Sequence, residues 1–237
     1  MVKNSIAHRE TRGRVPQCAA SASVLVLAVA LALFAADARA APCGNARPPE
    51  IRVTSEARKP DYRNALPRAQ IGALAGRGHM TSDKRHAGLT QTRTDFSVRP
   101  VLSFVRRGDG TVCASLQQLE ASWRIIQFQV DVAAEYRPGT CPYREILQHE
   151  NQHVAIVQRA FAEADAALRR DLGDLARRTR PFVLSGTPER AAQQMAERFM
   201  AAARPALDRY SRDTERANAA LDTPESYRAV SARCRDW

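Results

Sequence analysis

The stretch Cys141-Pro-Tyr-Arg-Glu-Ile-Leu-Gln-His-Glu-Asn-Gln-His-Val-Ala-Ile156 decides how the second half of the chain folds, and it holds the pattern His-Glu-x-x-His. It contains no glycine, and its only proline, Pro142, fits the first position of a helix, so we expect a helix here. Residues four apart lie one turn apart on the same helix face. His149 and His153 can therefore bind one Zn²⁺, with Glu150 beside them as a general base.

The residues after this stretch continue the helical pattern. Apolar positions recur at helical spacing to about residue 172, and both histidines fall on this apolar face. After a loop over about 177–186, Thr187-Pro188 predicts the start of a second long helix, antiparallel to the first. Thr223-Pro224 predicts a short third helix that ends near Cys234.

The residues before the motif predict a small sheet. Alternating apolar residues mark strands at 97–106, 111–119 and 123–136, and Arg107-Gly-Asp-Gly110 between the first two is typical of a hairpin turn. No helix-length spacer separates the strands, so we expect a largely antiparallel sheet of three to four strands. The predicted fold class is therefore α+β, with this sheet followed by two long antiparallel helices and a short C-terminal helix.

The first 40 residues are typical of an export signal. Basic residues precede the apolar run 24–36, and Ala38-Arg39-Ala40 fits a cleavage site, so we expect a signal peptide over 1–40 and a periplasmic or secreted protein. An uncleaved N-terminal anchor is the alternative. The segment 41–95 is expected to be irregular, apart from a strand-like piece at 51–54 and a helical turn at 66–74, and a metallohydrolase domain is expected over 96–237.

Removal of residues 1–40 would leave four cysteines, an even number that predicts two disulfides in an exported protein. Four cysteines allow three pairings. Our first choice joins Cys113 to Cys141, close to the motif, and Cys43 to Cys234, which would tie the two ends together.

The chain has 237 residues and a formal net charge of +11, and its basic residues are nearly all arginine. These arginines are scattered among acidic residues, without an interleaved aromatic module, and an exported protein rarely meets nucleic acid. We therefore exclude nucleic acid as a partner and expect a solvated basic surface. No segment after the leader is apolar enough to span a membrane. The sequence does not predict the oligomeric state.

A catalytic zinc needs a third protein ligand. No third histidine follows the motif closely, so we look to the second helix, where a turn centred near residue 182 would bring residues 210–217 opposite the histidines. Asp213 lies at the edge of the apolar stripe and is the first choice. Asp208 and Glu215 point roughly away from this stripe, and Glu215 is the reserve. Tyr210 fits either the core or a role in stabilising an oxyanion.

The motif helix and its surroundings resemble a bacterial family of unknown function that is described as predicted secreted zinc-dependent proteases. The resemblance rests on the export signal, the β-rich first half, and the run Tyr136, Gly139-Thr140-Cys141 and His149-Glu150-Asn151-Gln152-His153-Val154. It extends from about Val98 to the C-terminus. It implies His149 and His153 as zinc ligands and Glu150 as the base.

The functional expectation is an exported zinc-dependent hydrolase, a peptidase whose partner is a peptide or protein substrate. Two other functions stay open. One is a non-catalytic, zinc-stabilised periplasmic binding protein, in which His79, His86 or a second carboxylate would complete a closed site. The other is a basic protein that binds anionic envelope polymers, with the motif accidental.

Overall fold

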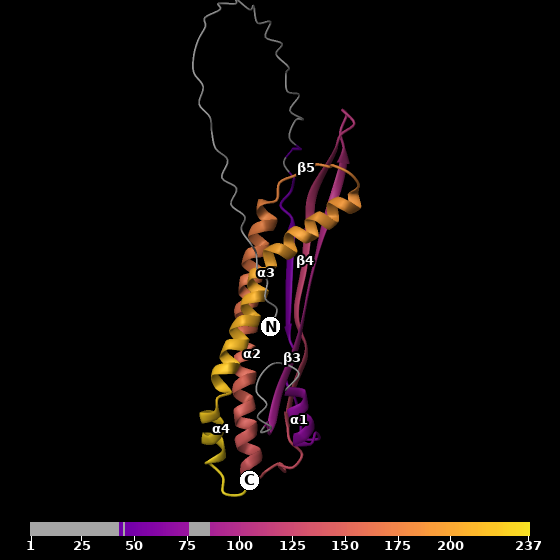
Figure 1. Cartoon of the computed structure of the whole chain (residues 1–237). Helices are drawn as coiled ribbons and strands as arrows, with labels where there is room; N and C mark the ends of the chain where they lie inside the picture. Colours follow the sequence, from indigo (N-terminus) through magenta and orange to yellow (C-terminus); the bar gives the residue numbers. More distant parts are fainter. Residues whose placement is uncertain (1–42, 45, 76–85) are drawn as a thin grey trace, which may run out of the picture. The chain divides into compact units, whose positions relative to one another are not determined.

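A computed structural model describes residues 43–44, 46–75 and 86–237. The described part contains five strands and four helices (Figure 1). In chain order these are β1 (Glu50–Ala57), β2 (Asp61–Arg63), α1 (Arg68–Ala75), β3 (Gly88–Arg106), β4 (Val112–Val132), α2 (Cys141–Arg178), β5 (Phe182–Val183), α3 (Pro188–Leu221) and α4 (Pro224–Ser231). The expected signal peptide over 1–40 lies outside the described residues.

Strand β4 is the centre of the sheet, because every other strand pairs with it. β3 runs antiparallel to it along one edge and forms the predicted hairpin, in which Gly110 adopts a positive φ of 84°. Along the other edge, β1 and β2 run parallel to β4 and β5 runs antiparallel. The sheet is therefore mixed, and the prediction of a largely antiparallel sheet is wrong for β1 and β2.

The N-terminal part of the domain is more regular than its composition suggests. The strand expected at 51–54 falls within β1, and the helical turn expected at 66–74 overlaps α1 from residue 68 onward. However, β2 and the first eight residues of β3 also lie in the segment 41–95 that was expected to be irregular. The two strands predicted at 111–119 and 123–136 are one continuous strand, β4, which already ends at Val132. The register of β4 with β3 shifts at two positions, and each shift interrupts the alternation of apolar residues along β4.

The two long helices begin where the sequence predicts. The hydroxyl groups of Thr140 and Thr187 each accept a hydrogen bond from the backbone N–H three residues later, and a proline follows each cap. Thr223 caps α4 in the same way. Figure 1 shows α3 bent between its halves, and Pro205 inside this helix removes a backbone hydrogen bond. The second half of α3 lies alongside α2.

The core lies between the inner face of the sheet and these two helices. Trp123 of β4 stacks on Phe161 of α2, with 5.2 Å between the ring centroids, and meets Tyr210 of α3 edge-on at 5.3 Å. Leu168 and Phe199 are fully buried in the same cluster. The other face of the sheet is polar and carries exposed ion pairs such as Arg99–Glu120. None of the helices in the described ranges is long and apolar enough to cross a membrane.

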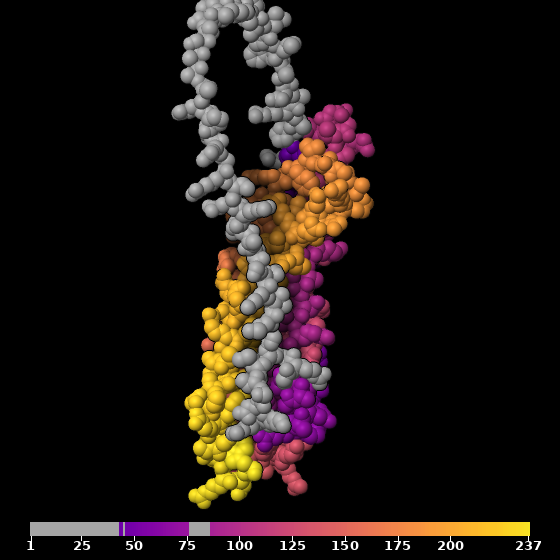
Figure 2. All heavy atoms as spheres, viewed as in Figure 1, coloured from indigo at the N-terminus to yellow at the C-terminus, as the bar shows by residue number. Residues whose placement is uncertain are grey.

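The two predicted disulfides are present with a different pairing: Cys43 joins Cys113, and Cys141 joins Cys234. The prediction that Cys113 joins Cys141 is wrong because Cys113 lies at the start of β4 and Cys141 lies beyond its other end, and this strand is about 65 Å long. Cys113 lies near the hairpin tip, which protrudes beside α3 in Figure 2 and exposes Val105. Cys43 precedes β1, whose parallel pairing with β4 begins near this end.

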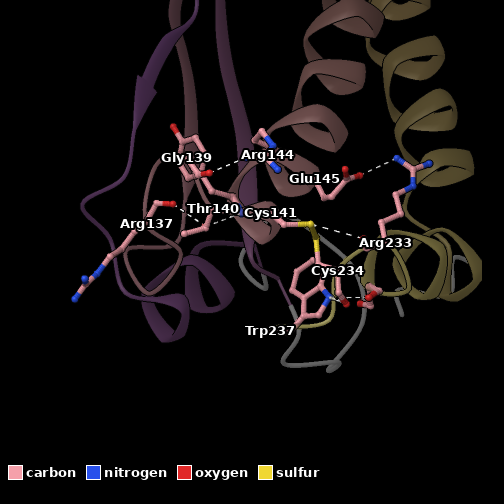
Figure 3. The surroundings of a disulfide bond; sticks show 11 residues. Arg137, Gly139, Thr140, Cys141, Arg144, Glu145, Arg233, Cys234 and Trp237 are labelled. Carbon is pink, nitrogen blue, oxygen red and sulfur yellow. Dashed lines mark hydrogen bonds and ion pairs between the residues drawn. A yellow bond between two sulfur atoms is a disulfide. The ribbon is translucent and has the colours of Figure 1, made fainter.

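The disulfide between Cys141 and Cys234 holds the C-terminal segment against the start of α2 (Figure 3). Arg233 adds an ion pair to Glu145 of α2 at 2.9 Å. Helix α4 itself has no fully buried residue. The covalent bond therefore adds an anchor at the C-terminal end of α4 to the contacts of its own side chains.

Replacing both Cys141 and Cys234 by serine should release α4. We expect faster hydrogen exchange of the α4 amides and a free energy of unfolding lower by about 2–5 kcal/mol, because the unfolded chain loses a long closed loop. The matched control replaces Cys43 and Cys113 by serine. It should lower the unfolding free energy similarly and leave exchange in α4 unchanged, and equal exchange in both variants would contradict this account.

Candidate metal centre

His149 and His153 lie on the buried face of α2, as their spacing predicts. Their side chains are 6% and 9% exposed, and their Nε2 atoms are 3.3 Å apart. The helix places them one turn apart, and the apolar residues of the same stripe turn this face towards the domain interior. Two imidazole nitrogens that face each other at this distance need a cation or a shared proton between them, since two lone pairs repel.

The third member of the group is Asp222, the residue that caps the C-terminus of α3. Its Oδ1 lies 3.1 Å from Nε2 of His149 and 3.0 Å from Nε2 of His153. Three potential ligand atoms therefore converge on one point. This is the one group in the described part of the chain whose histidine, cysteine or carboxylate ligand atoms could hold a metal ion. The group is accessible from one side, because Asp222 is exposed.

The predicted third ligand, Asp213, does not join this group. Its carboxylate pairs with Arg216 one turn further along α3. Glu215 and Asp208 are exposed on α3 and do not join the group either. The prediction of Asp213 is wrong because α2 and α3 pack against each other in a different register from the expected one. His153 contacts Asn218 and His149 contacts Asp222, so the two helices are related by a turn centred near residue 185 and not 182.

Two neighbouring side chains hold the ligands in place. Nδ1–H of His153 donates to Oδ1 of Asn218 at 2.9 Å, which leaves Nε2 of this ring directed at the convergence point. The hydroxyl of Tyr227 on α4 donates to Oδ1 of Asp222 at 3.0 Å, and its ring lies 5.4 Å from that of His149. Asn218 and Tyr227 escape a motif search because they lie far from His-Glu-x-x-His in sequence.

Glu150 is almost fully buried beside the two histidines, at 4% exposure. Oγ1 of Thr90 in β3 donates to its Oε2 at 2.8 Å. Burial raises the pKa of Glu150, and the nearby His153 and the Thr90 hydrogen bond partly oppose this. A buried carboxyl group held by one strong donor next to a metal-binding group has the position expected of a general base.

The electrostatics of the group are those of a cation site. Burial lowers the pKa of His153, but the hydrogen bond to Asp222 and the charge of Glu150 outweigh it and raise this pKa to about 9. Burial likewise disfavours ionised Asp222, yet the hydrogen bonds from both histidines and Tyr227 hold the pKa of its carboxyl well below the usual range. Without a metal, the positive charge of protonated His153 balances the negative charge of the Asp222 carboxylate.

The other residues considered from the sequence lie elsewhere. The ring of His86 lies edge-on to Tyr227 with 6.2 Å between centroids, so it borders the group without joining it. His79 lies outside the described residues. Tyr210 is buried against Trp123 in the core.

Replacing Asp222 by asparagine should weaken zinc binding at least about 100-fold, since loss of an outer-shell partner alone costs about 10–100-fold. The matched control is Asp213→Asn, the same chemical change on α3 away from the group, which should leave the dissociation constant unchanged. Competition with a chromophoric chelator measures both constants. Equal weakening in the two variants would show that Asp222 is not a ligand.

Zinc binding should release about one proton per ion at about pH 7.5, because His153 is protonated there in the metal-free protein and must lose this proton to bind a metal. As the pH rises, the dissociation constant for zinc should therefore fall about tenfold per pH unit until about pH 9 and stay level at higher pH. Calorimetric titration in two buffers of different ionisation enthalpy counts the protons. Binding without proton release would contradict a raised pKa for His153.

Comparison with known proteins identifies no relative of this chain. No protein-family model, no curated protein and no solved structure matches the chain. The resemblance to the family of predicted secreted zinc-dependent proteases therefore stays a prediction from the sequence. The case for a function rests on the atoms of the site itself.

Proposed function

We propose that this protein is a zinc-dependent hydrolase that cleaves amide bonds in peptides. One observation carries the proposal: His149, His153 and Asp222 converge on one point, and Glu150 lies buried next to them on the same helix. Three protein ligands with an accessible side, together with an adjacent carboxylate, are the parts of a catalytic zinc site.

The dimensions of the group support zinc. The three ligand atoms form a triangle with edges of 3.0, 3.1 and 3.3 Å. Tetrahedral zinc with bonds of about 2.0–2.1 Å separates its ligands by about 3.3 Å, so the triangle is close to one face of that tetrahedron. Two imidazoles and one carboxylate also suit zinc better than magnesium or calcium, which prefer oxygen ligands alone.

The residues divide the chemistry between them. His149, His153 and Asp222 hold the ion, which supplies Lewis-acid chemistry by polarising a carbonyl group and making water more acidic. Glu150 takes a proton from the attacking water and delivers it to the amine that leaves. Asn218 and Tyr227 keep two of the ligands oriented, since each makes a direct hydrogen bond to one of them.

A peptide substrate and an exported location are part of the proposal. In the described ranges β3 pairs only with β4, so the second edge of β3 can accept an extended peptide as an added strand, and its first residues lie next to Glu150. Two disulfides support an oxidising compartment, the periplasm or the cell exterior.

Replacing Glu150 by glutamine should abolish hydrolysis while zinc stays bound. Removal of a general base costs about 100–10,000-fold in rate, and the three ligands are untouched. Mass spectrometry of products from a peptide library gives the rate, and elemental analysis gives the zinc content. The matched control is Glu163→Gln, the same change on an exposed position of α2, which should keep full activity.

Two outcomes would overturn parts of this proposal. Full turnover by the Glu150→Gln variant would remove Glu150 from the mechanism. Stoichiometric zinc in the wild-type protein without hydrolysis of any peptide would instead favour the non-catalytic, zinc-stabilised binding protein.

A further inference from the structure

We propose that Gly88 and Thr90, at the start of β3, are the positioning residues that fix the Glu150 carboxylate for proton transfer. The inference rests on the proposed function, because it assigns how the base of that reaction is held. Neither residue belongs to the His-Glu-x-x-His motif, and both lie about 60 residues before it.

Thr90 acts on one oxygen of the carboxylate. Its hydroxyl donates to Oε2 at 2.8 Å, and the same hydroxyl lies 3.4 Å from the backbone oxygen of Glu150. Among the described residues, no other side chain donates to this carboxylate. A buried carboxylate needs such a partner, and a single donor from a rigid strand fixes its rotation.

Gly88 acts on the other side of the same group by its lack of a side chain. A Cβ atom at this position would lie 2.5 Å from Oε1 and 2.8 Å from Cγ of Glu150, and also 2.8 Å from Cγ2 of Ile146. Real Cβ atoms essentially never approach so closely. Gly88 is therefore needed for space, and it lets the strand backbone close directly onto Glu150.

The two contacts leave the two carboxylate oxygens in different states. Residues two apart on a strand face the same side, so Gly88 and Thr90 both face α2. Oε2 is occupied by the Thr90 hydroxyl, whereas no described residue donates to Oε1. We infer that Oε1 is the oxygen that takes the proton from water, and that Oε2 is the fixed one.

The test compares Thr90→Val, which removes the hydroxyl at nearly constant volume, with Thr90→Ser, which keeps it. The Val variant should lose about 10–100-fold in kcat, the cost typical of an outer-shell partner, with KM and zinc content unchanged. The Ser variant should recover to within about threefold of wild type. Thr94→Val, on the same strand about 13 Å further along, is the matched control and should keep full activity.

A second pair of variants tests the space requirement. Gly88→Ala should lower kcat at least about tenfold without loss of zinc, because Glu150 must move to admit the methyl group. Gly72→Ala is the control, since a Cβ at Gly72 would meet nothing within 4 Å. Unchanged kcat in both Thr90→Val and Gly88→Ala would overturn the inference.

A structural readout separates this inference from the proposed function. If the wild-type protein hydrolyses no peptide, the proposed function fails, and crystal structures of the zinc-loaded wild type and Thr90→Val decide the positioning alone. A rotated Glu150 carboxylate in the variant would support the role of Thr90. An unchanged carboxylate would overturn it.

Discussion

The rest of the structure depends on the contact of three aromatic rings: Trp123 of β4 stacks on Phe161 of α2 and meets Tyr210 of α3 edge-on. It fixes the central strand against both long helices at once. Aromatic rings bury large apolar areas, and their packing has a preferred geometry, so this contact sets how α2 lies across the sheet. The motif histidines lie two to three turns before Phe161 on the same buried stripe. Their depth in the domain follows from this contact.

The candidate metal centre brings together carboxylate charge and imidazole lone pairs, which repel one another unless a cation or a proton lies between them. Asp222 accepts from both imidazoles and from Tyr227, and Glu150 is buried a short distance away. Buried polar groups of this kind are costly unless they are paired. A proton on His153 pairs with the Asp222 carboxylate in the absence of metal, and a divalent ion held by all three side chains would pair with it more fully.

Much of this arrangement could be predicted from local sequence, because local rules decide it. The spacing of His149, Glu150 and His153 gave the helix face, and Thr140, Thr187 and Thr223 gave the helix starts. Sequence could not predict what depends on long-range packing. The pairing of α2 with α3 is offset by about two turns from the simple estimate made from the loop, so Asp222 and not Asp213 meets the histidines. The parallel pairing of β1 with β4 and both disulfides likewise depend on which segments meet in three dimensions.

The ligand set also has a mechanical consequence. His149 and Asp222 are 73 residues apart, and the disulfide between Cys141 and Cys234 spans 93 residues around them. An ion bound by these residues would therefore be a reversible cross-link that lies within the loop closed by the disulfide. The disulfide already shortens the loop that the ion must close, so the entropic cost of bringing the end of α3 to α2 is partly met before any metal arrives. In the oxidised chain the disulfide would thus help to preform a site for an ion, whereas the reduced chain would have to bring the two segments together without this link.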